Sequence, residues 1–379
     1  MKSVPKRKIC LVTSTRADYG IMSRMIELLA KDQDVDFKLI ATGMHLSKKF
    51  GLTINEITQK IYKKVNVDIE KDPSHSFSLV VEKFSKIFDK LNPDIVVLLG
   101  DRYEILGVAV ACMLTNTPIV HLYGGDATFG LIDEAIRHSI TKMSHLHFVS
   151  CEASRNRVIQ LGENPARVFN FGALGVENVK KVPLMSKKEL EESIGFKFNK
   201  KNILITFHPV TLEGNTKEQF SELLKALDEL KDTNIIITAP NSDDGSKELF
   251  ELIYEFTETH KNCLYIKSLG LKRYLSAIQY VDAVVGNSSS GIYEVPSFHK
   301  ATINIGNRQL GRVQASSVIN CKPEKEDILY AIEKGYNTDF SKTINPYEQE
   351  NTAKKIIEVI KQFDLSNILE KEFYDIEAQ

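Results

Sequence analysis

The densest group of ionisable side chains lies in the stretch HLYGGDATFGLIDEAIRH (121–138). Carboxylates close to histidines suit proton transfer, in which one group removes a proton and another returns one. Asp133 and Arg137 are four residues apart, so a plain salt bridge on one helix face is the simpler interpretation. That interpretation does not account for the Gly-Gly turn or for so many ionisable groups. We therefore expect acid/base chemistry from Asp126, Asp133, Arg137 and His138, whereas no clean metal-ligand spacing is present.

A second pair of candidates follows the apolar run DIVVLLG, in the segment GDRYE (100–104). An uninterrupted apolar run of this length is typical of a buried strand of a parallel sheet. Asp101 and Arg102 would then stand at the end of that strand, where such sheets bind their ligands. A structural ion pair is the alternative. The position at a strand end favours a functional role.

A loop near the N-terminus has the residue types that bind anions. TSTRADYG (13–20) follows the first apolar run, with Thr15 and Asp18 spaced as a capping box and Arg16 beside them. An ordinary helix cap with a solvated arginine is an equal alternative. The segment contains no G-x-G-x-x-G, so the dinucleotide-binding motif is absent.

The strongest local signal is the segment VVGNSSSGIYEVPSF (284–298). Serine hydroxyls and free backbone N–H groups at the start of a helix form a phosphate-binding loop without a Walker lysine. We expect the hydroxyls of Ser288, Ser289 and Ser290 to contact phosphate, and Glu294 to accept the hydroxyls of a ribose. Arg308 and Arg312 follow the next apolar run and would add the positive charge that a diphosphate needs. A serine-rich helix cap is the alternative.

Two weaker candidates precede that loop. His208 follows the apolar run NILITF, and Asn241 follows NIIITAP. A single loop histidine is more often structural than catalytic, and most polar turns only connect elements. Asn241 could contact a base or a ribose.

The elements that must position these residues alternate between short apolar runs and longer helical periods. Strands are predicted at 8–15, 37–43, 94–100, 118–125, 145–150, 202–210, 234–241, 263–268, 283–289 and 301–306. Helical patterns separate them, which predicts an α/β fold with parallel sheets. The pattern restarts after a lysine-rich stretch at 185–201, which we interpret as the hinge between two domains. We expect domains at 1–175 and 176–345, facing each other across a cleft, and a helical segment at 346–379 that packs on the first domain.

The composition excludes several classes of protein. The chain has 379 residues, a net charge of −1 and a pI near 6.8, which argues against binding nucleic acid or a membrane surface. No apolar run approaches the ~18 residues of a membrane span, and the N-terminus does not resemble a secretory signal. The five cysteines are scattered, which fits a reducing environment. We therefore expect a cytoplasmic protein without structural zinc. Since the dinucleotide-binding motif is absent, we also expect no nicotinamide or flavin cofactor.

Taken together, these motifs resemble the hydrolysing UDP-N-acetylglucosamine 2-epimerases. The resemblance covers nearly the whole chain and includes TSTRADYG, TGMH, GDRYE, the GGD…DEAIRH block, FHP, GNSSSGIYEVPS and INIGNRQLGR. It implies a GT-B-like pair of Rossmann-type domains with parallel sheets facing a central cleft. It also implies a UDP-sugar substrate, no nicotinamide cofactor, no indicated dependence on a divalent metal, and a dimer or tetramer.

The reaction that the resemblance implies has two stages. A base removes the C2 proton of the sugar while UDP leaves C1, which gives a 2-acetamidoglucal. Water then adds at C1 and a proton returns to C2 from the other face, so N-acetylmannosamine and UDP are released for sialic acid biosynthesis. Asp101 and Asp133 match the catalytic carboxylates of the family, and Arg137 and His138 match its active-site Arg-His pair. The matches to its UDP-contacting positions are Arg16, Arg102, His208, Ser288, Ser289, Glu294, Arg308 and, more loosely, Asn241.

One segment departs from the family pattern. Many members read H-I-E-G-G-E, whereas this chain reads H-L-Y-G-G-D, so Tyr123 replaces the glutamate proposed as catalytic and Asp126 replaces the second glutamate. The departure leaves open which group is the second acid/base. It also leaves open a UDP-diacetamido sugar such as N,N'-diacetylbacillosamine, used for legionaminic acid. The motifs also fit a non-hydrolysing epimerase, a GT-B glycosyltransferase and a nucleotide-sugar sensor without turnover.

Overall fold

The computed structural model describes residues 6–69, 72–129, 132–210, 215–240 and 246–376. Contacts divide the chain into two compact units. Unit 1 comprises residues 1–126, 133–178 and 349–379, and unit 2 comprises 127–132 and 179–348. The chain thus passes from unit 1 to unit 2 after Asn178 and returns after Glu348.

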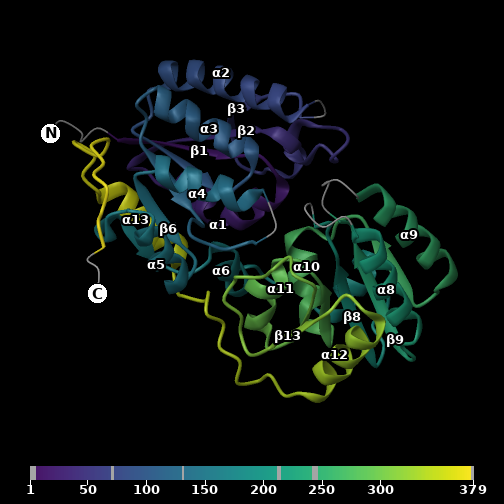
Figure 1. Ribbon diagram of the computed structural model, residues 1–379. Coiled ribbons are helices and arrows are strands. Elements are labelled where there is room, and N and C mark those ends of the chain that lie inside the picture. The colour runs from purple at the N-terminus through teal and green to yellow at the C-terminus, as the bar shows by residue number, and fades with distance from the viewer. Residues whose placement is uncertain (1–5, 70–71, 130–131, 211–214, 241–245, 377–379) are drawn as a thin grey trace. The chain divides into compact units, whose positions relative to one another are not determined.

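Unit 1 is built on a seven-stranded parallel sheet with the strand order β3-β2-β1-β4-β5-β6-β7 (Figure 1). Its strands are β1 (Arg7–Thr13), β2 (Val35–Thr42), β3 (Ile61–Val65), β4 (Ile95–Leu99), β5 (Ile119–Leu122), β6 (Leu146–Val149) and β7 (Val168–Asn170). Its helices are α1 (Arg16–Lys31), α2 (Pro73–Leu91), α3 (Tyr103–Leu114), α4 (Asp133–Met143), α5 (Glu152–Gln160), α6 (Leu174–Lys181, within which the chain leaves the unit) and α13 (Thr352–Gln362). Short 3-10 turns lie at Gly43–Leu46, Thr53–Glu56 and Pro165–Arg167.

Unit 2 contains a six-stranded parallel sheet with the order β10-β9-β8-β11-β12-β13. Its strands are β8 (Lys201–Thr206), β9 (Thr233–Thr238), β10 (Cys263–Ile266), β11 (Ala283–Gly286), β12 (Ala301–Ile305) and β13 (Val318–Cys321). Its helices are α7 (Lys187–Ile194), α8 (Thr216–Asp228), α9 (Ser246–Thr259), α10 (Gly270–Tyr280), α11 (Ser290–Tyr293) and α12 (Lys325–Asn337), with a 3-10 turn at Val295–Phe298.

Both faces of each sheet are covered by helices, as parallel sheets require. In unit 1, α1 and α13 pack on one face and α2, α3 and α4 on the other. In unit 2, α8, α9 and α12 share one core cluster, and α10 belongs to the cluster on the opposite face. The pair of parallel α/β units confirms the predicted fold class.

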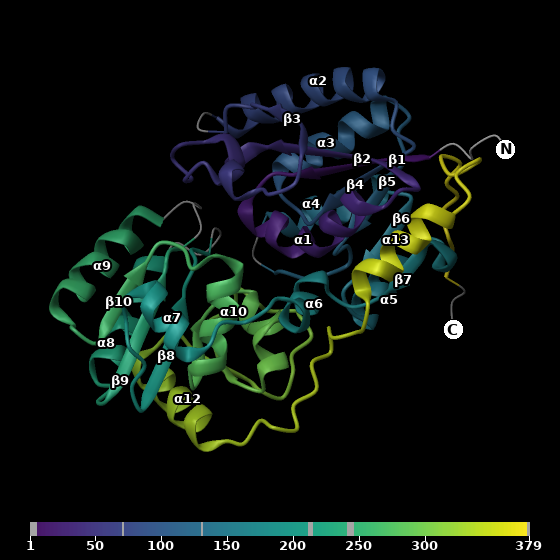
Figure 2. The ribbon, with the colours of Figure 1, turned by 180° about the vertical axis from the view of Figure 1, so that it is seen from behind.

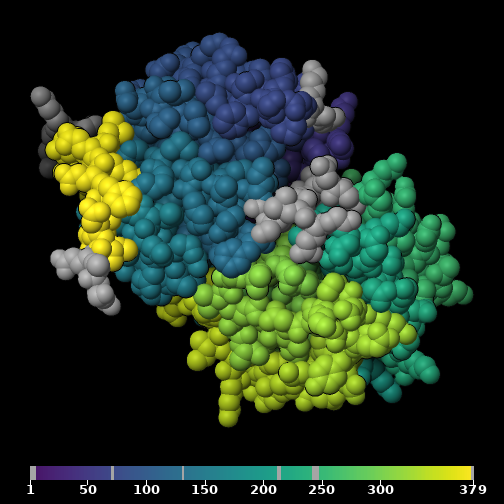
Figure 3. Space-filling view, in the orientation of Figure 1, coloured from purple at the N-terminus to yellow at the C-terminus, as the bar shows by residue number. Residues whose placement is uncertain are grey.

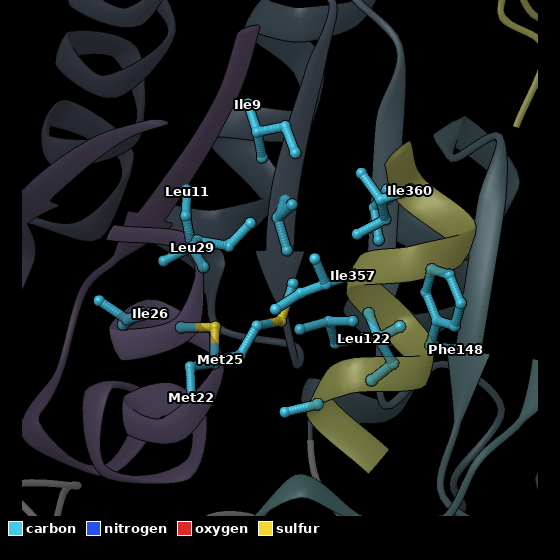
Figure 4. Packing of buried hydrophobic residues seen from close by; sticks show 14 of the residues in the cluster. Ile9, Leu11, Met22, Met25, Ile26, Leu29, Leu122, Phe148, Ile357 and Ile360 are labelled. Carbon is cyan, nitrogen blue, oxygen red and sulfur yellow. The ribbon is translucent and has the colours of Figure 1, made fainter. Parts of the chain in front are cut away.

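The C-terminal helix α13 completes the core of unit 1. Ile356, Ile357 and Ile360 are buried in the core cluster that contains Leu122 and residues of α1. Figure 2 shows the helix among the elements of unit 1, and Figure 4 shows Ile357 near Leu122. Lys361 pairs with Asp32 at 2.8 Å, beyond the end of α1. The residues after α13, yellow in the space-filling view, lie along the surface of unit 1 (Figure 3). The C-terminal segment 349–379, remote in sequence, therefore belongs to unit 1.

The segment 185–201 differs from our expectation of a hinge. Ser186 caps α7 through a capping box with Glu189, and the helix buries Leu190 completely within unit 2. The lysines and glutamates of this segment form the solvated side of a short amphipathic helix. A polar stretch in the sequence was thus an exposed helix face and not a linker.

Among the described helices, none is long and apolar enough to cross a membrane. No group of three or more His, Cys, Asp or Glu side chains in the described residues could hold a metal ion.

Candidate active site in two parts

The candidate residues lie in loops at, or one strand away from, the point where the strand order of each sheet reverses. In unit 1, β1 pairs with β4, so the loops that begin with Ser14 and Gly100 emerge side by side. In unit 2, β8 pairs with β11, which brings together the loops that begin with Phe207 and Asn287. Such switch points are where open parallel sheets bind ligands.

In unit 1, Arg137 is the centre of the predicted acid/base group. Its side chain is 1% exposed, and its Nε donates to Oδ2 of Asp101 at 2.8 Å. Nη2 donates to the same oxygen, and Nη1 donates to Glu134 Oε2 and to the carbonyl of Asp126, each at 2.8 Å. Burial lowers the pKa of Arg137, but the charges of Asp101, Asp126 and Glu134 outweigh that effect and raise it. The guanidinium therefore stays charged and fixes the Asp101 carboxylate, which is 27% exposed.

His138 is oriented by the same carboxylate that binds Arg137. Its Nε2 lies 3.1 Å from Glu134 Oε1, and its buried Nδ1 has no hydrogen-bond partner among the described residues. Glu134 thus contacts both members of the Arg-His pair. We noted Glu134 in the crowded stretch of the sequence but did not predict it as a site residue; its spacing of three and four residues from the pair was the available signal.

His121 binds the backbone of the loop that carries Asp101. Its Nε2 lies 2.8 Å from the carbonyl of Gly100, and its Nδ1 lies 3.1 Å from Thr141 Oγ1. Burial lowers the pKa of His121 to about 3, so the ring is neutral. Because a carbonyl only accepts, Nε2 carries the proton, and His121 holds the backbone next to Asp101.

Asp126 is buried, and its carboxylate binds serines that follow β6. Its Oδ1 accepts hydrogen bonds from Ser150 Oγ at 2.8 Å and Ser154 Oγ at 2.7 Å. A Cβ at the preceding Gly125 would lie 2.2 Å from the carbonyl of Ser154, and φ is +77° there, so only glycine fits. These contacts hold the loop on α5 and present the Asp126 carbonyl to Arg137.

Tyr123, which replaces the proposed catalytic glutamate of the family, is turned toward the protein. Its backbone has a φ of +66°, and its hydroxyl accepts a hydrogen bond from the Gly175 N–H at 3.1 Å. The ring packs against the core cluster of β5 and β6. The phenol therefore anchors the start of α6.

The remaining unit 1 candidates lie around this group. Asp133, half-buried, is the first residue of α4, and Arg102 precedes α3 and pairs with the fully buried Glu104 at 3.2 Å. Arg16 is exposed, and its side chain makes no hydrogen bond or ion pair with the described residues. The predicted capping box of α1 is confirmed, because Thr15 Oγ1 accepts from the Asp18 N–H at 3.2 Å and Asp18 Oδ2 accepts from the Thr15 N–H at 3.0 Å.

In unit 2, Asn287 joins the three loops that carry the anion-binding candidates. Its side chain accepts from the His208 N–H at 2.7 Å and donates to the His208 carbonyl at 2.8 Å. Its own carbonyl accepts from Gln309 Nε2 at 2.7 Å and from Arg308 Nη1 at 3.3 Å. Asn287 was quoted in the sequence motif but not selected, because an asparagine after a strand gives no sign that its amide is buried.

Ser288 and Ser289 are partly buried at the start of α11. This helix is only one turn long and continues as the 3-10 turn Val295–Phe298. A helix this short has only a small dipole, so the hydroxyl and backbone N–H groups are the main features that this loop offers to an anion. His208 is buried, and burial together with Arg308 lowers its pKa. Asn241 lies outside the described residues.

Glu294 ends α11 and carries the most perturbed carboxyl of unit 2. Burial raises its pKa to about 7, against the effects of a hydrogen bond from Ser290 and the charge of Arg312. Arg312 lies over the ring of Tyr293, with Cζ 5.4 Å from the centroid. Arg312 also lines a cavity of about 570 Å³ at the ends of β12 and β13, together with Asn304, Asn307, Gln314, Asn320 and Lys322.

The fold and these two groups define a two-domain Rossmann-type protein with polar loops at both switch points, one group rich in carboxylate, arginine and histidine side chains and the other in serine, asparagine and arginine side chains. Residues 27–361 match the family model described as UDP-N-acetylglucosamine 2-epimerase. The chain belongs to this epimerase family, and the resemblance seen in the sequence is confirmed.

Curated relatives match the chain along almost its full length. A Campylobacter jejuni GDP/UDP-N,N'-diacetylbacillosamine 2-epimerase (hydrolyzing) is 42% identical over 98% of this chain and 100% of its own. The polysialic acid biosynthesis protein P7 of Escherichia coli is 40% identical, over 98% of both chains. A Neisseria meningitidis UDP-N-acetylglucosamine 2-epimerase is 30% identical, over 98% of this chain and 99% of its own.

Solved structures share the fold. The Neisseria meningitidis UDP-GlcNAc 2-epimerase bound to UDP-GlcNAc has a TM-score of 0.81 at 18% identity, covering 93% of this chain and 99% of that chain. The Methanocaldococcus jannaschii enzyme in complex with UDP-GlcNAc and UDP has a TM-score of 0.78 at 18% identity, with the same coverage. The protein is thus a UDP-sugar 2-epimerase by family, with the GT-B-like pair of domains that we predicted.

Proposed function

We propose that this protein is a hydrolysing 2-epimerase that converts a UDP-2-acetamido sugar and water into the free 2-epimer and UDP. The observation that carries the proposal is the 42% identity, over 98% of the chain, to a relative named as hydrolysing. The charged Asp101–Arg137 pair at the end of β4 supports it, because elimination needs a carboxylate base held in a fixed place.

In the first stage, a carboxylate takes the C2 proton while the bond between C1 and the diphosphate oxygen breaks, so that a C1–C2 double bond forms. We assign proton transfer to Asp101 and Asp133, with Arg137 and His138 beside them. The C2 proton is weakly acidic, so the elimination depends on stabilising the departing diphosphate. That part falls to unit 2, through Ser288, Ser289 and Arg308, and to Arg16 and Arg102 of unit 1. Water then adds its hydroxyl at C1 and a proton returns to C2.

Asp126 receives a supporting part in this proposal. Its carboxylate already accepts two serine hydroxyls, and its carbonyl binds Arg137. It therefore holds the loop and the guanidinium on which the Asp101 carboxylate depends.

Two sugars are candidates for the substrate. The 42% relative and a 35% relative from Legionella pneumophila are both named as N,N'-diacetylbacillosamine 2-epimerases, which favours UDP-N,N'-diacetylbacillosamine. The 40% relative is named for polysialic acid biosynthesis and the 30% relative as a UDP-N-acetylglucosamine 2-epimerase, which favours our first expectation, N-acetylmannosamine from UDP-N-acetylglucosamine. On identity we place the diacetamido sugar first.

A single assay tests the reaction and separates the substrates. The full chain is incubated in D2O with each UDP-sugar, and the products are analysed by mass spectrometry and NMR. We expect free UDP and a 2-epimeric sugar that carries one deuterium at C2, formed faster from the diacetamido sugar. A UDP-bound epimer without free UDP would indicate a non-hydrolysing enzyme. Transfer only to an added acceptor, without deuterium at C2, would indicate a glycosyltransferase, and tight binding without UDP release a sensor.

A further inference from the structure

The third serine of the loop, Ser290, lies between a buried tyrosine and the carboxylate of Glu294. The hydroxyl of Tyr274, on α10, donates to Ser290 Oγ at 2.8 Å. The Ser290 side chain in turn lies near the Glu294 carboxyl and favours its ionised form as a hydrogen-bond partner. The backbone closes the same turn, since the Glu294 N–H donates to the Ser290 carbonyl at 2.9 Å. Tyr274, Ser290 and Glu294 therefore form a chain of three side chains from α10 to the end of α11.

The direction of these bonds is set by the chemistry of the groups. A serine hydroxyl has one proton to donate and lone pairs that accept. Because Tyr274 donates to Ser290, the serine proton is left for the Glu294 carboxylate. The tyrosine keeps its own proton, since burial raises the pKa of Tyr274 and the nearby Glu294 charge opposes a second anion. The Ser290 hydroxyl, which is fixed by the hydrogen bond from Tyr274, thus holds the Glu294 carboxylate at one oxygen.

Such support matters because the Glu294 carboxylate stands in an unfavourable place for its charge. Burial disfavours the ionised form, and Ser290 and Arg312 are the groups that favour it. A hydrogen bond to a charged acceptor is about twice as strong as one between neutral groups, and its geometry depends on how the acceptor is oriented. A loss of the Ser290 bond would leave the carboxylate less well placed for any ligand hydroxyl.

We propose that Tyr274 and Ser290 are positioning residues that aim the Glu294 carboxylate at the two ribose hydroxyls of the uridine nucleotide, so that recognition of the ribose depends on a tyrosine that does not touch the ligand. The proposal rests on the proposed function, because it assumes that Glu294 faces the ribose of UDP. It assigns the ribose specificity of the site to α10 as well as to α11.

The experiment compares two ligands that differ only in the groups at issue. Binding of UDP and of 2',3'-dideoxy-UDP is measured by calorimetry at pH 8 for the wild-type chain, Tyr274→Phe and Ser290→Ala. Two charge-assisted hydrogen bonds predict that the wild type prefers UDP by roughly 10- to 100-fold. We expect each variant to reduce this preference at least threefold, through weaker binding of UDP with unchanged binding of the dideoxy ligand. Ser290→Thr, which keeps the hydroxyl, should restore it.

Tyr280→Phe is the matched control. Tyr280 lies on the same helix, and its hydroxyl donates to the Met185 carbonyl at 3.0 Å, away from Ser290. The loss of this hydroxyl should leave the preference for UDP unchanged. If Tyr274→Phe does not fold, Ser290→Ala still tests the chain of contacts from the other side.

The outcomes separate the two proposals. Equal weakening of both ligands in Tyr274→Phe and Ser290→Ala, or an unchanged ratio, would show a merely structural role and overturn the inference while UDP binding by the wild type stands. A wild-type chain that binds neither ligand would overturn the proposed function, and the inference with it.

Discussion

Arg137 donates from both Nε and Nη2 to a single oxygen of Asp101, a residue 36 positions earlier in the chain. The arginine comes from α4 and the aspartate from the loop after β4. A guanidinium that is 1% exposed is costly to bury unless it is paired, so this contact also keeps the two elements together. The Asp101–Arg137 ion pair thus both orients Asp101, the candidate base, and holds α4 to the loop after β4.

The first prediction concerns Asp101→Asn. The amide keeps an oxygen that Arg137 can bond, so the chain should fold, but it cannot take up the C2 proton. We expect the rate of UDP release to fall by about 10²- to 10⁴-fold, the usual contribution of a general base. UDP affinity should change less than about threefold, because the nucleotide ligands that we propose lie mainly in unit 2. Steady-state kinetics measures the rate of UDP release, and calorimetry measures the UDP affinity.

Asp36→Asn, which removes a surface partner of Lys38, is the control and should leave both quantities unchanged. Retained turnover in Asp101→Asn would remove Asp101 from the mechanism.

The second prediction separates a supporting role of Asp126 from a proton-transfer role. Asparagine offers the same oxygen to Ser150 and Ser154 and leaves the backbone carbonyl for Arg137. We therefore expect Asp126→Asn to keep kcat/KM within about tenfold of the wild type. A loss as large as that of Asp101→Asn, in a variant with normal thermal stability, would mean that the Asp126 carboxyl carries a proton.

The parts of the fold that could be predicted are those whose strands lie inside the sheets. The run Ile95–Leu99 is fully buried and uninterrupted, and such runs identify a parallel sheet. The strands β3, β7 and β13, which we did not predict, are all at sheet edges. Their sequences IYKKV, VFN and VINC mix apolar and polar residues because one side of an edge strand faces water. These three edge strands have no uninterrupted apolar run to detect, whereas the fourth edge strand, β10, has the apolar sequence CLYI and was predicted.

The candidate site was predictable as a set of loops but not as a set of contacts. The Gly100–Arg102 loop and the start of α4 were both selected, yet only the adjacency of β4 and β5 brings Asp101 to Arg137. The spacing in the sequence suggested Asp133 as the ion-pair partner of Arg137, whereas the structure pairs Arg137 with Asp101 and Glu134. Asn287 could not be selected because its importance comes from hydrogen bonds to the loops after β8 and β12, and the sequence does not show that these loops lie beside it.

The third prediction concerns acid stability. The Ile119 N–H donates to Nδ1 of His145 at 3.1 Å at the start of β6, and burial, with a contribution from Lys371, lowers the pKa of His145 to about 4. An unfolded histidine titrates near 6.5, so the unfolded chain binds the proton first. The stabilisation is therefore complete above pH 6.5 and is lost as the pH falls from 6.5 to 4, by up to about 1.4 kcal/mol per pH unit.

His145→Asn, which retains an acceptor near Nδ1, should reduce this loss. Urea unfolding at pH 7.5, 6.0 and 5.0 measures it: the difference in unfolding free energy between variant and wild type should shift in favour of the variant as the pH falls. His75→Asn is the matched control, because His75 is exposed on α2 and its replacement should leave the pH dependence of the wild type unchanged. A parallel pH dependence in wild type and His145→Asn would contradict the prediction.

The fourth prediction concerns the point where β11 delivers the serine loop. Gly286 has a φ of +136°, and a Cβ there would lie 2.1 Å from the carbonyl oxygen of Thr206 on β8. An added methyl group must therefore separate the two strands that meet at the switch point, and it must do so next to Asn287. Gly286→Ala should lower the unfolding free energy by more than about 3 kcal/mol, since strain and a backbone clash combine. In the fraction of Gly286→Ala that folds, UDP affinity should fall at least tenfold.

Gly195→Ala is the control, because Gly195 also has a positive φ, +66°, but nothing lies within 4 Å of its Cβ position. The left-handed backbone alone should cost about 1–2 kcal/mol of unfolding free energy and leave UDP binding intact. Equal losses of stability in the two variants, with equal UDP affinity, would show that the approach of β11 to β8 at Gly286 does not shape the nucleotide loop.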